Sequence, residues 1–89
     1  MIIGLALATS GCTGGEHEMA LKFADCPAAV QRTIIAHADG VMFPEVDRET
    51  KKGGRVVFEA KGKKPDGTKI EIKVAADGHL VEFKSEVDD

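Results

Sequence analysis

Apolar and polar residues alternate along much of the C-terminal half of the chain, and this period of two predicts β-strands. The dipeptide Asp77-Gly78 is a signal for a two-residue hairpin turn. A turn there opposes Val74 to Val81 on the apolar face of the predicted strands. On the polar face it opposes Lys73 to Glu82, and side chains of opposite charge in such positions stabilise a strand pair.

A second hairpin is predicted at Pro65-Asp66-Gly67, a three-residue loop with its glycine in a bulge. This loop opposes Phe58 to Val74 on one face. On the other face it opposes Glu59 to Lys73. Both hairpins place Val74 on the apolar face, and a slip of one residue would turn it outward in both. The two registers therefore support each other.

The connection Lys52-Gly53-Gly54 predicts a further hairpin, whose register the sequence leaves open. A three-residue loop there opposes Asp47 to Glu59, which is unfavourable for like charges, and it places Arg48 on the apolar face. Pro44 has no N–H to donate to a sheet. The segment from Pro44 to Arg48 is therefore expected to be an edge strand or a bulge.

A helix is predicted from Pro27 to Ala38. Proline suits the first helical position because its missing N–H would have no partner there. Val30, Ile34 and Ala38 recur at helical spacing and form an apolar stripe. Asp39-Gly40 supplies the stop, since glycine adopts the left-handed conformation that ends many helices.

These elements predict an α+β fold, with one N-terminal helix packed on a four-stranded antiparallel β-meander. The alternation over residues 19–23 fits a short strand that leads into the helix. The helix is expected to cover the apolar face of the sheet. The sheet residues of that face are Val56, Phe58, Ile70, Ile72, Val74, Val81 and Phe83.

The first residues have the pattern of an export signal. Residues 1–8 carry no charge and are mostly apolar, a run too short to span a bilayer but long enough for the apolar region of a signal peptide. Small residues follow, and then Cys12. This arrangement resembles a bacterial lipoprotein signal, which implies that Cys12 is lipidated. An ordinary thiol at Cys12 or a Cys12–Cys26 bridge is the alternative.

Length and composition limit the domain organisation and the classes of partner. The chain has 89 residues, of which 43% are hydrophobic and 30% charged, so a single small folded domain is expected. The expected division is a signal peptide at 1–11, a lipid-anchored tether at 12–18 and the domain at 19–89. A net charge of −3 and the lack of Trp and Tyr argue against a nucleic-acid partner.

Five segments of the predicted domain carry a resemblance to a known family. They are Pro27-Ala28-Ala29-Val30-Gln31, Val56-Val57-Phe58-Glu59-Ala60, Pro65-Asp66-Gly67, Ile70-Glu71-Ile72-Lys73-Val74 and Asp77-Gly78-His79-Leu80. Their order and spacing over residues 19–87 resemble the PepSY-like family, which is related in fold to single repeats of the β-lactamase-inhibitory protein. The resemblance implies a domain of the bacterial cell envelope, in the periplasm or at the cell surface, that binds or restrains a peptidase or another envelope protein. It brings no catalytic residue.

The residues themselves predict no catalytic, cofactor-binding or metal-binding set. No Gly-x-Ser-x-Gly nucleophile motif is present. Glu59, Glu71 and Glu82 each oppose a lysine, which predicts a solvated ladder of charges rather than acids with a raised pKa. His17 stands between two glutamates, but neighbouring side chains of an extended segment point apart, so a solvated tether is expected there.

The expected function is that of a non-enzymatic module that binds an envelope protein and is held at the membrane by lipid on Cys12, without a cofactor. The candidate contacts are the loop residues Lys51, Lys52 and Arg55, the turn residues Pro65 and Asp66, and the edge residues Pro44 and Arg48. The basic clusters near the hairpin ends could instead contact anionic lipid. The alternatives are a small-ligand or metal sensor that uses His37, His79 or Cys26, and a passive surface lipoprotein.

Overall fold

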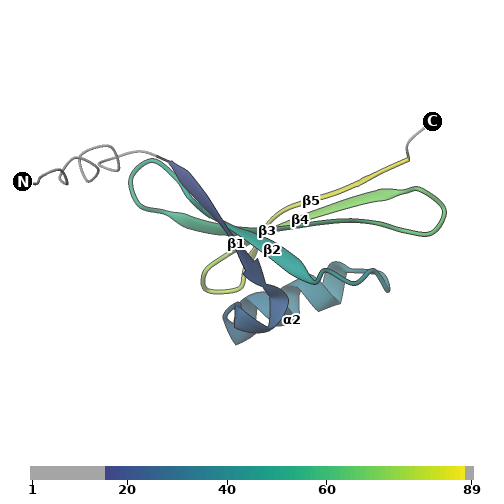
Figure 1. The fold of residues 1–89 in the computed structure, drawn as a ribbon, viewed down its shortest axis with the longest axis horizontal. Coiled ribbons are helices and arrows are strands. Elements are labelled where there is room, and N and C mark those ends of the chain that lie inside the picture. Colours follow the sequence, from purple (N-terminus) through teal and green to yellow (C-terminus); the bar gives the residue numbers. More distant parts are fainter. Residues whose placement is uncertain (1–15, 88–89) are drawn as a thin grey trace, which may run out of the picture.

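The structure is a computed structural model, and it describes residues 16–87. The elements in chain order are β1 (His17–Lys22), the short 3-10 helix η1 (Phe23–Asp25), α2 (Ala28–His37), β2 (Glu45–Thr50), β3 (Val56–Lys63), β4 (Lys69–Ala75) and β5 (Leu80–Glu86). Figure 1 shows a strongly twisted sheet with α2 against one face. The β2–β3 loop and the β3–β4 turn lie at opposite ends of the molecule.

Within residues 16–87 the sheet has five antiparallel strands in the order β1-β2-β3-β4-β5, so the expected four-stranded sheet is wrong. The additional strand is β1, which pairs with β2 from His17 opposite Thr50 to Lys22 opposite Glu45. Backbone hydrogen bonds hold β1, and nearly all of its side chains are exposed. Because the side chains of β1 contribute so little to the core, the sequence of this strand has only a weak hydrophobic pattern.

The β3–β4 and β2–β3 registers follow the turn residues. Phe58 lies opposite Val74 and Glu59 opposite Lys73, which confirms the predicted β3–β4 hairpin. The β2–β3 register, left open above, is the one that opposes Asp47 to Glu59. Its loop is closed by Lys51 N–H donating to the Arg55 carbonyl at 2.7 Å.

The β4–β5 hairpin follows the prediction as far as Lys73 opposite Glu82. There a bulge shifts the register, and Val74 lies opposite Leu80 rather than the predicted Val81. The physical reason is the turn, in which Ala75 N–H donates to the His79 carbonyl at 2.9 Å. The loop is therefore residues 76–78 rather than a two-residue turn, and the bulge absorbs the difference.

Helix α2 confirms the predicted helix to within one residue at each end, with Pro27 as its N-cap and Ala38 as its C-cap. Asp39 and Gly40 follow with φ of 52° and 83°, the left-handed backbone expected of the stop. The helix packs chiefly against β4. The core between α2 and the sheet contains Cys26, Val30, Ile34, Ala38, Phe43, Val46, Phe58, Ala60, Ile70, Ile72 and Val74.

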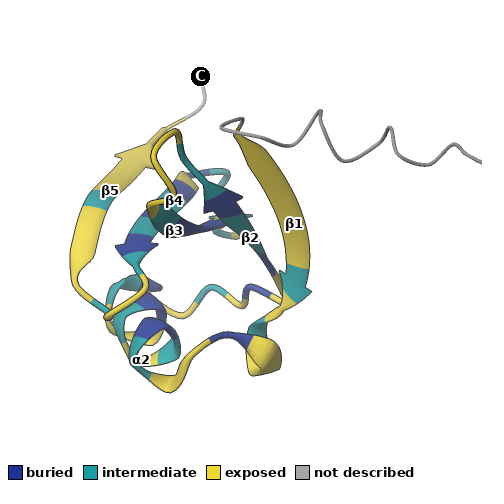
Figure 2. Ribbon diagram, turned by 90° about the vertical axis from the view of Figure 1, so that its left-hand side faces the viewer, coloured by how far each residue is buried: buried dark blue, intermediate teal, exposed yellow. Residues whose placement is uncertain are grey.

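Burial departs from the expected pattern at both flanks of this core. Val81 and Phe83 are exposed rather than buried, because the ten-residue helix packs chiefly on β4 and covers β5 only in part, with the His37 ring 5.8 Å from the Phe83 ring. Figure 2 shows β5 mostly in the colour of exposed residues, whereas β3 and β4 carry buried segments. On the face away from α2, Val57, Glu59 and Glu49 are buried. The twist therefore makes part of the polar face inaccessible to solvent.

Candidate functional site

The predicted partner contacts lie in separate parts of the molecule. Lys51, Lys52 and Arg55 belong to the β2–β3 loop, and Pro65 and Asp66 to the β3–β4 turn at the opposite end (Figure 1). Within the turn, Asp66 accepts a hydrogen bond from the Thr68 backbone N–H at 2.8 Å, and this bond lowers the pKa of the Asp66 carboxyl. These residues therefore do not form one continuous binding surface.

The expected edge strand at Pro44 and Arg48 is wrong. Strand β2 lies between β1 and β3, so both of its sides are paired. Arg48 is half-buried between Met19 of β1 and Phe58 of β3 in the pairing register. The Pro44 carbonyl accepts a hydrogen bond from Phe23 N–H at 3.0 Å. This strand cannot accept a further strand, because its backbone groups already have partners.

The predicted lipidation site at Cys12, the signal peptide at 1–11 and most of the tether at 12–18 lie outside the described residues. The last two tether residues, His17 and Glu18, belong to β1. Among residues 16–87, no helix has the length and apolar character needed to cross a membrane.

The three residues considered for a sensor do not come together. Cys26 is free and buried, and burial, with the charge of Asp25, raises the pKa of its thiol. The His37 ring lies 5.8 Å from the Phe83 ring, between centroids, and His79 Nδ1 lies 2.8 Å from Asp77 Oδ1. In the described part of the chain, the single group of three or more His, Cys, Asp or Glu side chains within reach of one ion contains none of these sensor candidates.

That group is a cluster of carboxylates on the sheet face away from α2, formed by Glu18 of β1, Glu49 of β2 and Glu59 of β3. Glu18 lies directly opposite Glu49. Glu59 lies on the same face of β3, two residues after Val57, which is the residue opposite Glu49. One carboxylate oxygen from each residue lies within 4.8 Å of the other two. Glu49 and Glu59 are only 9% and 5% exposed, whereas Glu18 is exposed.

Burial and neighbouring carboxylates raise the pKa of Glu59 to about 8, because the protonated acid can share its proton with Glu71 and Glu49. The pKa of Glu71 is lowered by its hydrogen bond with Glu59. Burial alone would raise the pKa of Glu49, but hydrogen bonds with Glu59 and Lys51 lower it below its ordinary value. The cluster therefore retains one carboxylic acid beside ionised carboxylates at neutral pH.

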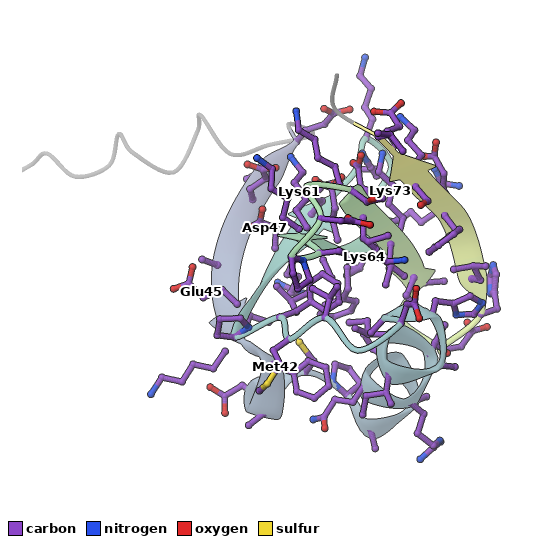
Figure 3. All side chains as sticks on the ribbon, turned by 90° about the vertical axis from the view of Figure 1, so that its right-hand side faces the viewer. Met42, Glu45, Asp47, Lys61, Lys64 and Lys73 are labelled. Atoms are coloured by element: carbon purple, nitrogen blue, oxygen red, sulfur yellow. The ribbon has the colours of Figure 1, made fainter. Side chains whose placement is uncertain are left out.

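The lysines of this face are too distant from Glu59 to neutralise it by hydrogen bonding. Lys61 Nζ and Lys73 Nζ each lie 4.0 Å from a Glu59 carboxylate oxygen. Figure 3 shows both lysines, together with Asp47, on the side of the sheet turned away from α2. Asp47 lies directly opposite Glu59 and adds a further negative charge.

The expectation of a fully solvated ladder is therefore wrong at Glu59. The opposing Lys73 is present as predicted, but the twisted sheet buries the carboxyl among the side chains of neighbouring strands. The sequence did contain a signal in the like-charged pair of Asp47 and Glu59. That pair counts against the register in an ordinary solvated hairpin, and here it belongs to an acidic cluster.

A second feature is the free edge formed by β5. Its apolar side chains Leu80, Val81 and Phe83 are 38%, 47% and 42% exposed. The opposite edge strand, β1, exposes a single large apolar side chain, Met19. Within residues 16–87, β5 therefore combines an unpaired strand edge with the more apolar of the two edge surfaces.

Comparison of the chain with protein-family models, with curated proteins and with solved structures finds no match. The PepSY-like resemblance therefore stays a prediction that rests on the segments named above.

Proposed function

We propose that this protein is a lipid-anchored protein of the bacterial cell envelope whose domain binds another envelope protein without catalysing a reaction. The anchor is proposed from the apolar residues 1–8 and the small residues before Cys12. The binding role is supported above all by one observation, the apolar and unpaired edge of β5.

The proposed mode of binding is the addition of an extended partner segment to β5. Exposed strand edges present unpaired N–H and C=O groups, and proteins usually protect them with charged residues, proline or a covering element. Strand β5 does carry Glu82, Lys84 and Glu86 on one face. Its other face presents Phe83, which stays 42% exposed although the His37 ring of α2 lies 5.8 Å from it. A partner strand would pair with the edge, and its apolar side chains would cover this face.

The edge of β5 replaces the predicted contacts at Pro44 and Arg48, which lie in a strand paired on both sides. The loop residues Lys51, Lys52 and Arg55 and the turn residues Pro65 and Asp66 lie beyond the two ends of the central strands. They remain candidates for secondary contacts with the same partner.

Site-specific crosslinking in cells tests this function. A photoreactive amino acid at Ser85, exposed on β5, should crosslink one envelope protein. Phe83→Glu should abolish the crosslink, because it puts a charge into the proposed apolar contact. Met19→Glu is the matched control on the opposite edge strand and should leave the crosslink unchanged.

Equal crosslinking by the wild type and Phe83→Glu would refute binding at this edge. The destabilised variant Phe58→Ala controls for nonspecific capture, because Phe58 is part of the core. A separate fractionation of the wild type and Cys12→Ser tests the anchor. Release of both into the soluble fraction to the same extent would contradict lipidation.

A further inference from the structure

We propose that β5 pairs with β5 of a second copy of this chain, antiparallel and in the register that places Phe83 opposite its own copy. The two five-stranded sheets would then join into one continuous sheet about a two-fold axis. This inference rests on the proposed function, because both use the free edge of β5. It names a second occupant of that edge, which competes with the partner strand.

The backbone of β5 directs the polar groups of Phe83 to the free edge. Ala75 N–H donates to the His79 carbonyl, so the backbone groups of Ala75 point toward β5. These directions alternate along an antiparallel strand, so the groups of Lys73 also point toward β5, where Glu82 lies opposite. Glu82 therefore bonds inward, and the N–H and C=O of Phe83 point outward. Two copies of Phe83 can exchange both hydrogen bonds.

The charges of β5 are complementary to those of an antiparallel copy. With Phe83 opposite its copy, Glu82 of each chain lies opposite Lys84 of the other. Within one chain, Lys73 lies opposite Glu82 and Glu71 lies opposite Lys84. The alternation of positive and negative side chains across β4 and β5 would therefore continue through the interface. Opposite charges in directly opposed positions stabilise a strand pair.

Other symmetric registers of the two strands fit less well. A shift by two residues places either Glu82 or Lys84 opposite its own copy, and like charges in such positions are destabilising. A shift by four residues leaves only three residues of each β5 paired. The proposed register spans all seven residues of Leu80–Glu86, because Phe83 lies at the centre of the strand.

The face of the sheet toward α2 would gain an apolar contact across the axis. Phe83 lies opposite Ile72 of β4 and is 42% exposed, so its copy would extend this apolar row. Helix α2 packs chiefly against β4. The two copies of β4 would be three strand spacings apart, about 14 Å. Packed helices need only about 8–10 Å between their axes, so the two helices leave room for the Phe83 rings.

The dimer should be weak and reversible. Strand β5 contributes seven residues, whereas a standard interface has about 20–30 residues a side. We expect a dissociation constant on the order of 10⁻⁴ M. Self-pairing would then protect the exposed edge, and a partner strand that makes more contacts would displace the second copy.

Sedimentation velocity of the full 89-residue chain tests the pairing. The wild type should change from monomer to dimer over concentrations from about tenfold below to about tenfold above the expected dissociation constant. Glu82→Lys and Lys84→Glu should each weaken dimerisation at least about tenfold, because each puts like charges at two cross-strand positions. Both side chains are at the surface, so circular dichroism should show an unchanged fold.

The decisive sample is an equimolar mixture of Glu82→Lys and Lys84→Glu. In a mixed dimer both cross-strand positions again hold opposite charges, so the mixture should dimerise like the wild type although each variant alone does not. Glu18→Lys is the matched control, because it reverses a charge on the opposite edge strand, β1. It should dimerise like the wild type.

Three results would overturn the inference. The first is a wild type that stays monomeric at the highest concentration. The second is a mixture that dimerises no better than its two components. The third is growth beyond the dimer, which would indicate that β5 pairs with β1 of the next copy, since such a contact does not close.

The self-pairing and the proposed function fail separately. A monomeric chain would refute the self-pairing, while a crosslink from Ser85 to another envelope protein would still support the proposed function. A dimer whose Ser85 crosslinks only to a second copy of the chain would support the self-pairing and refute the proposed function.

Discussion

Replacing Glu59 with glutamine should change how the stability of the domain depends on pH. In metal-free buffer, the folded protein holds a proton on Glu59 up to about pH 8, whereas the unfolded chain loses it near the ordinary value of 4.5. The unfolded state therefore binds fewer protons between these values, so the free energy of unfolding falls as the pH rises through that range. Above about pH 8 the decline should cease, because both states are then ionised.

The size of the effect follows from the two pKa values. A tenfold change in the acidity constant corresponds to about 1.4 kcal/mol, so a pKa raised from 4.5 to about 8 gives an upper limit of about 5 kcal/mol. Glu49 and Glu71 have lowered pKa values and act in the opposite direction, but they do so below pH 4.5. The range from pH 5 to 8 therefore isolates Glu59.

Urea unfolding followed by circular dichroism at several pH values between 5 and 8 measures this effect. The wild type should lose several kcal/mol over the range, on the order of the limit above, and Glu59→Gln should lose much less, because its amide does not ionise. All other titratable side chains are common to both proteins, so the difference between the two curves belongs to Glu59. Glu82→Gln serves as the control and should follow the wild type. Parallel curves for the wild type and Glu59→Gln would refute the assignment of a neutral, buried Glu59.

Two further substitutions test the packing on the other face of the sheet. Phe58 is 3% exposed in the core, so Phe58→Ala should lower the free energy of unfolding by about 3–5 kcal/mol, and an unchanged urea midpoint would contradict this placement. Gly62→Ala should destabilise the fold by about 1–3 kcal/mol, since the new Cβ would lie 2.8 Å from the Phe43 ring. A melting temperature equal to that of the wild type would show that this ring moves aside without cost.

The strand registers show what the turn chemistry of a sequence can determine. Gly67 has a φ of 95°, and the loop that it closes gives the predicted β3–β4 pairing along the whole hairpin. The pair Asp77-Gly78 predicted a two-residue loop, whereas the structure has the three-residue loop 76–78. A tertiary contact accompanies the three-residue form, in which the Gly78 carbonyl accepts a hydrogen bond from the Thr33 hydroxyl on α2. Local sequence could not show that contact, so the bulge beside Val74 was missed.

The carboxylate cluster shows what reasoning from the sequence alone could not predict. Reasoning from directly opposed pairs gave each glutamate one lysine and predicted an exposed face, and Lys73 does lie opposite Glu59. The cluster depends instead on diagonal neighbours and on Glu18, whose strand was not placed in the expected sheet. Only the twist of the assembled sheet brings these side chains together. The edge of β5 was missed for a related reason, because the length of α2 determines how much of the sheet it covers.

The order of strands in the sheet has a consequence for how the chain folds and opens. Strands β2 to β5 are joined by the short loops 52–54, 65–67 and 76–78, so their contacts are local in sequence and should form early. Strand β1 is different, because residues 23–44 separate it from β2 and the entire helix lies in that connection. Its pairing should therefore form last. In native-state hydrogen exchange, the β1 amides should exchange through a local opening that leaves the remaining meander and its core folded.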